Sequence, residues 1–271
     1  MRKSGLSAPQ LPGIGSLNLF EDGPLNGQKI LIIPDIFHSM KIYAPLINRL
    51  NSQFRLAIID LPGHFSSASP ENLTLPLLVD EFVQLIDYLG WSQFSIVGHG
   101  IGCQIGCLLS SQFLISNFFS MSPSCSLYEE CEFRKIVGSC CRSEITWNFN
   151  PIIDGIFKVS AGESWKSIFS LSNDVLINIW EKYEQVDFRD NDLYYQLDGK
   201  PIDKVKFIIF QNDCMMKSKQ AVKFFKEIKL SQEVDVVMIE QASHTPFLDV
   251  DILIKIADII LSSFQTSFAT K

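Results

Sequence analysis

The sequence predicts an α/β fold: a mostly parallel, doubly wound sheet with helices on both faces and an inserted helical cap. Three observations predict it. Short apolar runs alternate with amphipathic stretches along most of the chain, and these runs are nearly continuous, as in strands buried on both faces. Residues 124–200 interrupt the alternation. We therefore expect a core domain of residues 1–123 and 201–271 and a cap of residues 124–200.

The individual elements follow from periodicity and from their boundary residues. The expected strands are Ser16–Phe20, Ile30–Pro34, Arg55–Asp60, Phe94–Gly98, Asn117–Ser122, Val205–Phe210 and Val234–Ile239. The expected helices are Met40–Leu50, Pro76–Leu89, Ile101–Phe113, Lys219–Ile228 and Leu248–Phe264. Pro76 near the start of its helix and Gly90 after its end are typical helix boundaries.

The amino-terminal part gives two more specific expectations. Residues 1–15 are rich in Gly, Pro and Ser, and we expect them to lie loosely on the surface. The first two strands are expected to pair with each other through the turn around Asp22, Gly23 and Gly27.

Composition narrows the function classes. With 271 residues, of which 46% are hydrophobic, the chain can bury the core of one large domain. A net charge of −7 disfavours a nucleic-acid partner, because phosphate binding needs clustered Lys and Arg. Seven irregularly spaced cysteines favour neither a disulfide framework nor a metal site. We expect no metal, no cofactor and no membrane partner, and a cytoplasmic location.

The most specific motif lies between the strand Phe94–Gly98 and the helix that follows it. The segment Val97-Gly98-His99-Gly100-Ile101-Gly102 resembles the nucleophile elbow of the α/β-hydrolase family, whose pattern is Gly-x-Ser-x-Gly. Both flanking glycines match the pattern. Glycine stands at position 100, where the family has its nucleophilic serine.

Other landmarks of that family occur in the same order. Asp60-Leu61-Pro62-Gly63-His64 resembles the family's turn after an early strand. Asp213 follows the strand Val205–Phe210, where the family has its acid, and His244 follows the strand Val234–Ile239, where it has its histidine. The resemblance covers residues 16–265 and implies the α/β-hydrolase fold. It assigns the catalytic positions to Gly100, Asp213 and His244.

Glycine at position 100 changes the chemistry that the resemblance implies. Glycine relieves the backbone strain of the elbow and removes the only group that could form an acyl-enzyme. The oxyanion hole would consist of the backbone N–H groups of Ile36 and Ile101. Asp35 stands where the family has a glycine, and its carboxylate would oppose an oxyanion. Asp35 either points to solvent or faces the substrate as a second acid or base.

The histidines allow more than one interpretation. His244 is either a general base oriented by Asp213 or the remnant of an ancestral site. His99 is expected to pack beside the elbow. His38 and His64 are expected to be loop residues near the mouth of the pocket rather than catalysts. Gly98, Gly100 and Gly102 do not make a dinucleotide-binding motif, because the third glycine comes one residue too early.

Three functions remain open. The first is a serine-independent enzyme, such as a lyase or an isomerase, in which the dyad of His244 and Asp213 acts as a base or activates water. Its substrate would be a small, largely apolar organic molecule. The second is a non-catalytic pseudo-hydrolase that binds a ligand or a protein partner. The third is an ester or thioester hydrolase whose serine has been mutated.

Overall fold

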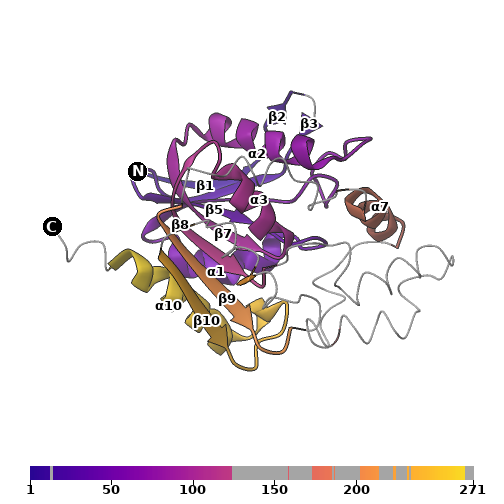
Figure 1. The fold of residues 1–271 in the computed structure, drawn as a ribbon. Coiled ribbons are helices and arrows are strands. Elements are labelled where there is room, and N and C mark those ends of the chain that lie inside the picture. Colours follow the sequence, from indigo (N-terminus) through magenta and orange to yellow (C-terminus); the bar gives the residue numbers. More distant parts are fainter. Residues whose placement is uncertain are drawn as a thin grey trace.

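An eight-stranded, mostly parallel sheet forms the centre of the molecule (Figure 1). The structure is a computed structural model that describes residues 1–12, 15–123, 158, 173–184, 186, 202–213, 222–223, 231 and 233–265. The strand order is β1-β4-β6-β5-β7-β8-β9-β10, in which β4 runs antiparallel to both of its neighbours, β1 and β6, and all the other neighbouring strands pair in parallel. The predicted fold class is therefore confirmed.

Apart from β1, which no apolar run predicted, the strands of the large sheet overlap the predicted runs, although β4 begins three residues later than predicted. They are β1 (Arg2–Ser7), β4 (Leu19–Pro24), β5 (Gln28–Ile33), β6 (Phe54–Ile59), β7 (Gln93–His99), β8 (Leu114–Met121), β9 (Lys204–Phe210) and β10 (Glu233–Ile239). A separate small sheet pairs β2 (Gln10–Leu11) with β3 (Gly15–Ser16). The central strands β5, β6 and β7 are buried on both faces, which explains their continuous apolar sequences.

Helices cover both faces of the sheet. α1 (Ala44–Leu50) and α10 (Val250–Gln265) pack together on one face, and α2 (Leu75–Leu89) and α3 (Ile101–Leu109) pack on the other (Figure 1). The short 3₁₀ helices η1 (Met40–Tyr43) and η3 (Pro246–Leu248) precede α1 and α10. α2 begins one residue before the predicted start, with Thr74 capping its first turn, and it ends as predicted at Gly90, which has the left-handed conformation.

Two expectations for the amino-terminal part are wrong. Residues 2–7 form the edge strand β1, which is paired along its length with β4, and do not lie loosely on the surface. The strands β4 and β5 do not pair with each other, because β6 lies between them, and Asp22 and Gly23 belong to β4 rather than to the predicted turn. The apolar pattern identifies strands but not their neighbours, and β6 needs a hydrogen-bonded partner on each side.

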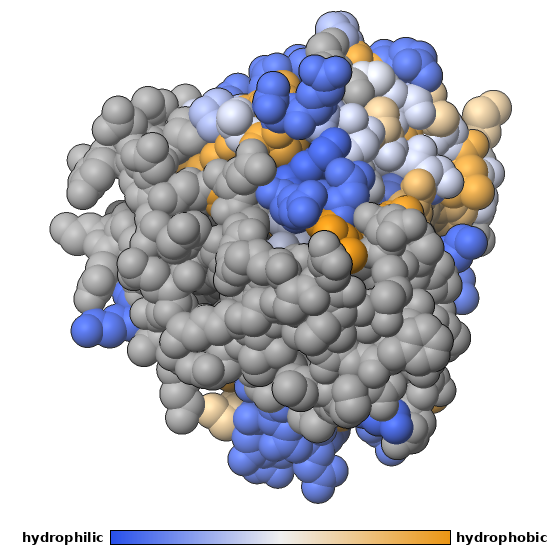
Figure 2. Space-filling model, turned by 90° about the vertical axis from the view of Figure 1, so that its right-hand side faces the viewer, coloured by the Kyte–Doolittle hydropathy of each residue, from blue (hydrophilic) through white to orange (hydrophobic). Residues whose placement is uncertain are grey.

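Much of the predicted cap lies outside the described residues. Within residues 124–200 the structure describes the helix α7 (Asn173–Glu184) together with Lys158 and Val186. The predicted helix Lys219–Ile228 is described only at Val222 and Lys223. Figure 2 views the molecule from the side of α7, and the described residues visible there are mainly hydrophilic. None of the described helices has the length and apolar character needed to cross a membrane.

Candidate active site

The turn at Gly100 has the sharp geometry of a strand-to-helix elbow. β7 ends at His99, Gly100 has φ 52° and ψ −115°, and α3 begins at Ile101. A Cβ added to Gly98 would lie 2.7 Å from the carbonyl oxygen of Gly102 and 2.9 Å from Cys103, so the strand and the helix approach too closely for a side chain there. The elbow therefore retains its sharp geometry although it carries no nucleophile, and glycine adopts the positive φ at position 100 without strain.

The carboxylate of Asp35 fills the space beside Gly100. Asp35 follows β5, is fully buried, and accepts a hydrogen bond at Oδ1 from the N–H of Ile101 over 2.9 Å. A Cβ built on Gly100 would overlap the Asp35 carboxylate, because it would lie less than 3.0 Å from the carboxylate atoms, a separation that real Cβ atoms do not show. The Asp35 carboxylate thus fills the space of a serine side chain. It also accepts the hydrogen bond of the Ile101 N–H, one of the two expected oxyanion donors. The interpretation that Asp35 points to solvent is wrong.

His244 is held between two buried carboxylates. Its Nε2 lies 2.7 Å from Oδ2 of Asp35, its Nδ1 lies 2.9 Å from Oδ2 of Asp213, and both carboxylate side chains are 1% exposed. Burial alone would lower the pKa of His244. The charge and hydrogen bond of Asp213, and then those of Asp35, outweigh burial and raise the pKa to about 10. His244 is therefore an imidazolium that donates both ring protons.

Ser122 joins this group and was not identified from the sequence. It follows β8, has a positive φ of 45°, and donates a short hydrogen bond from its hydroxyl to Oδ2 of Asp213. Its Oγ also lies 3.4 Å from Nδ1 of His244. The only sequence signal was its position at the carboxyl end of the strand next to β7, where side chains of parallel strands meet.

Tyr43 connects the elbow to the histidines. Its hydroxyl lies 2.9 Å from Nδ1 of His99, and Nε2 of His99 lies 2.9 Å from the carbonyl oxygen of His244. Because that carbonyl can only accept, Nε2 of His99 carries the proton and Nδ1 accepts from Tyr43. The Tyr43 hydroxyl also accepts from the backbone N–H of Asp35 over 3.3 Å. His99 packs beside the elbow as expected.

His38 is a second member of this network. Its Nδ1 lies 3.2 Å from the Tyr43 hydroxyl, its Nε2 lies 3.1 Å from Oγ1 of Thr245, and its ring stacks on His99 with centroids 5.0 Å apart. Burial, followed by the charge of His244, lowers the pKa of both His38 and His99 well below the usual value. Both rings are therefore neutral beside the imidazolium of His244.

His64 supports the loop that carries Asp35. Its Nε2 accepts a hydrogen bond from the N–H of Phe37 over 2.9 Å, and its Nδ1 donates to the carbonyl of Pro62 over 3.1 Å. Burial lowers the pKa of His64 to about 4, which keeps Nε2 free to accept. Phe37 has a φ of 67° and stacks on Trp180 of α7. His38 and His64 are thus buried structural residues and do not lie at a pocket mouth.

The remaining predicted residues fall in the same region. Ile36, expected as the second oxyanion donor, directly follows Asp35 and is 3% exposed. Among the described residues, no group of three or more His, Cys, Asp or Glu side chains is arranged to hold a metal ion. Cys103 and Cys107 are buried, and burial raises the pKa of both thiols far above the physiological range. Neither thiol is a candidate nucleophile.

The arrangement differs chemically from an ester-hydrolysing triad. In such a triad, a neutral histidine takes a proton from the serine, and backbone N–H groups wait for the oxyanion. Here Nε2 of His244 already donates to Asp35, so it cannot accept a proton. The N–H of Ile101 is occupied by the same carboxylate. Asp35 therefore lies in the site as a bound carboxylic acid product would.

Comparisons with known proteins agree with the fold. A family model described as the alpha/beta hydrolase fold matches residues 29–132. A serine hydrolase-like protein from Danio rerio is 28% identical over 94 residues, which are 34% of this chain and 29% of that protein. The match thus spans less than a third of the length of that relative.

Solved structures resemble nearly the whole chain. The enol-lactonase of Burkholderia xenovorans LB400 has a TM-score of 0.74 at 16% identity, covering 96% of this chain and 100% of that one. A carboxylesterase structure from Nitrososphaera gargenis has a TM-score of 0.77 at 16% identity, with 98% and 100% covered. The 2-hydroxy-6-oxo-6-phenylhexa-2,4-dienoate hydrolase of Rhodococcus sp. strain RHA1 has a TM-score of 0.76 at 14% identity, with 98% and 100% covered. The chain has the α/β-hydrolase fold.

Proposed function

We propose that this α/β-hydrolase-fold chain is a non-catalytic pseudo-hydrolase, in which a buried ion network replaces the ester-hydrolysing site. One observation carries the proposal: the Asp35 carboxylate occupies both the position of the nucleophile and the hydrogen bond of the Ile101 N–H. A substrate carbonyl would need both of these positions. The chain would then act by binding a ligand or a protein partner.

The serine-independent enzyme is less well supported. A histidine that acts as a general base must be neutral and within reach of the substrate proton. His244 is protonated, fully buried, and engaged at both ring nitrogens by Asp35 and Asp213. It could act as a base only after Asp35 leaves, which would expose an unpaired buried charge at a cost of about 3–5 kcal/mol.

A hydrolase that has merely lost its serine is also less well supported. In that case the space beside position 100 should fit a serine side chain. A Cβ at Gly100 instead meets the Asp35 carboxylate. Glycine at position 100 and aspartate at position 35 are therefore complementary in space, which favours a site built around both residues.

The first experiment compares the natural chain with the variants Gly100→Ser and Asp35→Gly/Gly100→Ser. Each would be assayed on p-nitrophenyl esters, thioesters and lactones. We expect no turnover by the natural chain and none by Gly100→Ser, whose serine collides with Asp35. The double variant clears the collision and frees the Ile101 N–H, so it should gain esterase activity that His244→Ala abolishes.

A second assay addresses base chemistry without a serine. The natural chain and His244→Ala would be incubated in deuterated water with small ketones and esters that carry acidic C–H bonds. We expect no uptake of deuterium above the rate without protein. Ester turnover or deuterium uptake that the natural chain catalyses and His244→Ala loses would refute the non-catalytic assignment. A silent double variant would instead show that the site differs from an esterase at further positions.

A further inference from the structure

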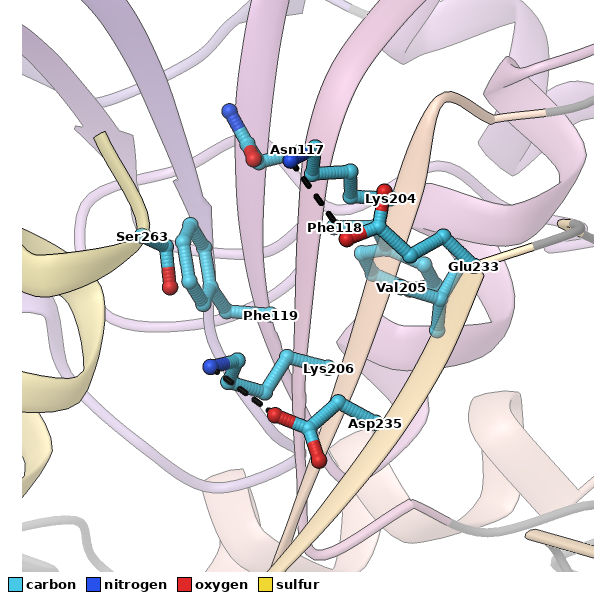
Figure 3. Close-up of a pocket in the computed structure, with 9 residues that line it drawn as sticks. All are labelled: Asn117, Phe118, Phe119, Lys204, Val205, Lys206, Glu233, Asp235 and Ser263. Carbon is cyan, nitrogen blue, oxygen red and sulfur yellow. Dashed lines mark ion pairs between the residues drawn. The ribbon is translucent and has the colours of Figure 1, made fainter. Parts of the chain in front are cut away.

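Two hollows lie at the amino ends of the parallel strands, far along the sheet from the elbow. The larger has a volume of about 540 Å³ and is lined by Asn26–Lys29, Ser92–Ser95, Ser116, Asn117 and Phe264. The smaller, of about 80 Å³, is drawn in Figure 3 and lies between β8, β9 and β10. Asn117 lines both hollows. Gly100, in contrast, follows the carboxyl end of β7.

We propose that these two hollows, which share Asn117 and are here called the amino-end groove, bind a neutral, hydroxyl-rich small molecule of the saccharide class. The proposal is independent of whether the elbow is catalytic, since no residue of the elbow lines the groove. It gives the chain a binding site that the filled elbow does not offer.

The polar lining matches the hydrogen-bonding pattern of sugar hydroxyls. Amide and hydroxyl side chains dominate it, including Asn26, Gln28, Gln93 and Ser116. An amide offers donors and an acceptor, and a hydroxyl does both, so together they complement neighbouring hydroxyl groups that also donate and accept. Nε2 of Gln93 already donates to Oγ of Ser116 over 2.9 Å, which holds the exposed amide and the half-buried hydroxyl side by side.

Aromatic residues supply the apolar part of the lining. Phe94 is 2% exposed and Phe264 is 8% exposed, and both line the larger hollow. Their rings are rigid parts of the core: Phe94 packs against Trp91, and Phe264 packs against Phe54. Small-molecule sites combine such apolar walls with a few placed polar groups.

The charges in the smaller hollow are paired within the protein. Lys204 lies 3.4 Å from Glu233, and Lys206 lies 3.0 Å from Asp235, each pair bridging β9 and β10 (Figure 3). Each lysine is neutralised by the residue opposite it in the parallel register. The charges that line the smaller hollow therefore cancel, and Lys29 is a charged residue in the lining of the larger hollow. A lining that is otherwise uncharged or paired favours a neutral ligand over an anion.

Asn117, which lines both hollows, has a buried polar atom without a partner. It is 8% exposed, and its Nδ2 donates to Oγ of Ser95 over 3.3 Å. Its Oδ1 is buried and accepts no hydrogen bond. A buried carbonyl oxygen without a donor is unfavourable, so a ligand hydroxyl that donates to Oδ1 after rotation of the side chain would stabilise the complex.

The test is a titration of the full chain with glucose, maltose, N-acetylglucosamine and myo-inositol, followed by ligand-observed NMR and by calorimetry. The variant Gln93→Ala/Ser116→Ala removes two polar groups of the groove. The matched control Gln10→Ala/Ser16→Ala removes the same residue types from the paired strands β2 and β3. Circular dichroism verifies that both variants fold.

We expect at least one of these compounds to bind at millimolar concentration. The groove variant should weaken that binding about tenfold, because two hydrogen bonds are lost, and the control should leave it unchanged. Absence of binding by all four compounds would overturn the proposal. Binding that the groove variant and the control affect equally would overturn it as well, since the compound would then bind elsewhere.

Discussion

Substitution of Gly100 by alanine tests the central geometric claim, because it adds one carbon atom at the point where Asp35 is packed. The new Cβ would overlap the Asp35 carboxylate, and ordinary contact begins only at about 3.4 Å. The carboxylate must therefore move by on the order of 1 Å. It cannot do so and keep its hydrogen bonds of 2.9 Å to Ile101 and 2.7 Å to His244.

The expected cost follows from two effects. Alanine at φ 52° costs about 1–2 kcal/mol relative to glycine, because its Cβ is too close to the backbone in the left-handed region. Displacement of Asp35 leaves the buried charges of Asp35 and His244 without full pairing, which costs about 3–5 kcal/mol when complete. Partial relaxation reduces the sum, so we expect Gly100→Ala to destabilise the fold by about 3–5 kcal/mol. That corresponds to a fall in Tm of roughly 10 °C.

The assay is a double-mutant cycle by thermal and urea unfolding. The variants are Gly100→Ala, Asp35→Gly and Asp35→Gly/Gly100→Ala. Removal of the Asp35 side chain also removes the collision, so the double variant should be at least about 2 kcal/mol more stable than the sum of the single effects predicts. A Gly100→Ala variant as stable as the natural chain, or effects that simply add, would refute the packing of Asp35 against the elbow.

Three further predictions concern titration and strain. In Asp35→Asn, NMR should find the pKa of His244 below the value of about 10 in the unchanged protein. A raised histidine pKa stabilises the fold most below pH 6.5, and this stabilisation is lost as the pH rises towards 10. Asp35→Asn should therefore be most destabilised at acidic pH. Glu81 is fully buried with both carboxylate oxygens unpaired, and burial raises its pKa to about 8. As the pH rises from 4.5 to 8, urea titrations should therefore find Glu81→Gln more stable relative to the natural chain, by several kcal/mol. Ser122 has a φ of 45°, and its hydroxyl donates to Asp213. Both Ser122→Gly and Ser122→Ala lose that hydrogen bond, but only glycine relieves the backbone, so Ser122→Gly should be about 1 kcal/mol more stable in the same assay. Equal stabilities would show that the backbone at Ser122 is not strained.

The fold was predictable because its signals are local. Continuous apolar strands, amphipathic helices and the boundary residues Pro76 and Gly90 each depend on a few neighbouring positions. The errors concern pairing partners, which are not local. The edge strand β1 has an exposed, polar sequence, and it exists because β4 offers it a hydrogen-bonding partner.

The candidate site was predictable only in its positions. The order and spacing of Gly100, Asp213 and His244 follow from the resemblance to a known family, and the structure brings these residues together. The role of Asp35 did not follow, since nothing in the sequence shows that a residue from the loop after β5 reaches the space left by Gly100. Ser122 was overlooked for a similar reason: its contact with Asp213 joins residues 91 positions apart.

Gly100 and Asp35 are best understood as one exchange. The resemblance places a side chain at position 100 and none at position 35, and this chain has the reverse, so the same space remains filled. The exchange also alters the energetics of the elbow. A catalytic elbow leaves the N–H of Ile101 without a protein acceptor so that it can bind an oxyanion, and such preorganisation reduces stability. In this chain Asp35 satisfies that N–H and balances the charge of His244, so the elbow gains stability at the expense of the chemistry for which its geometry is suited.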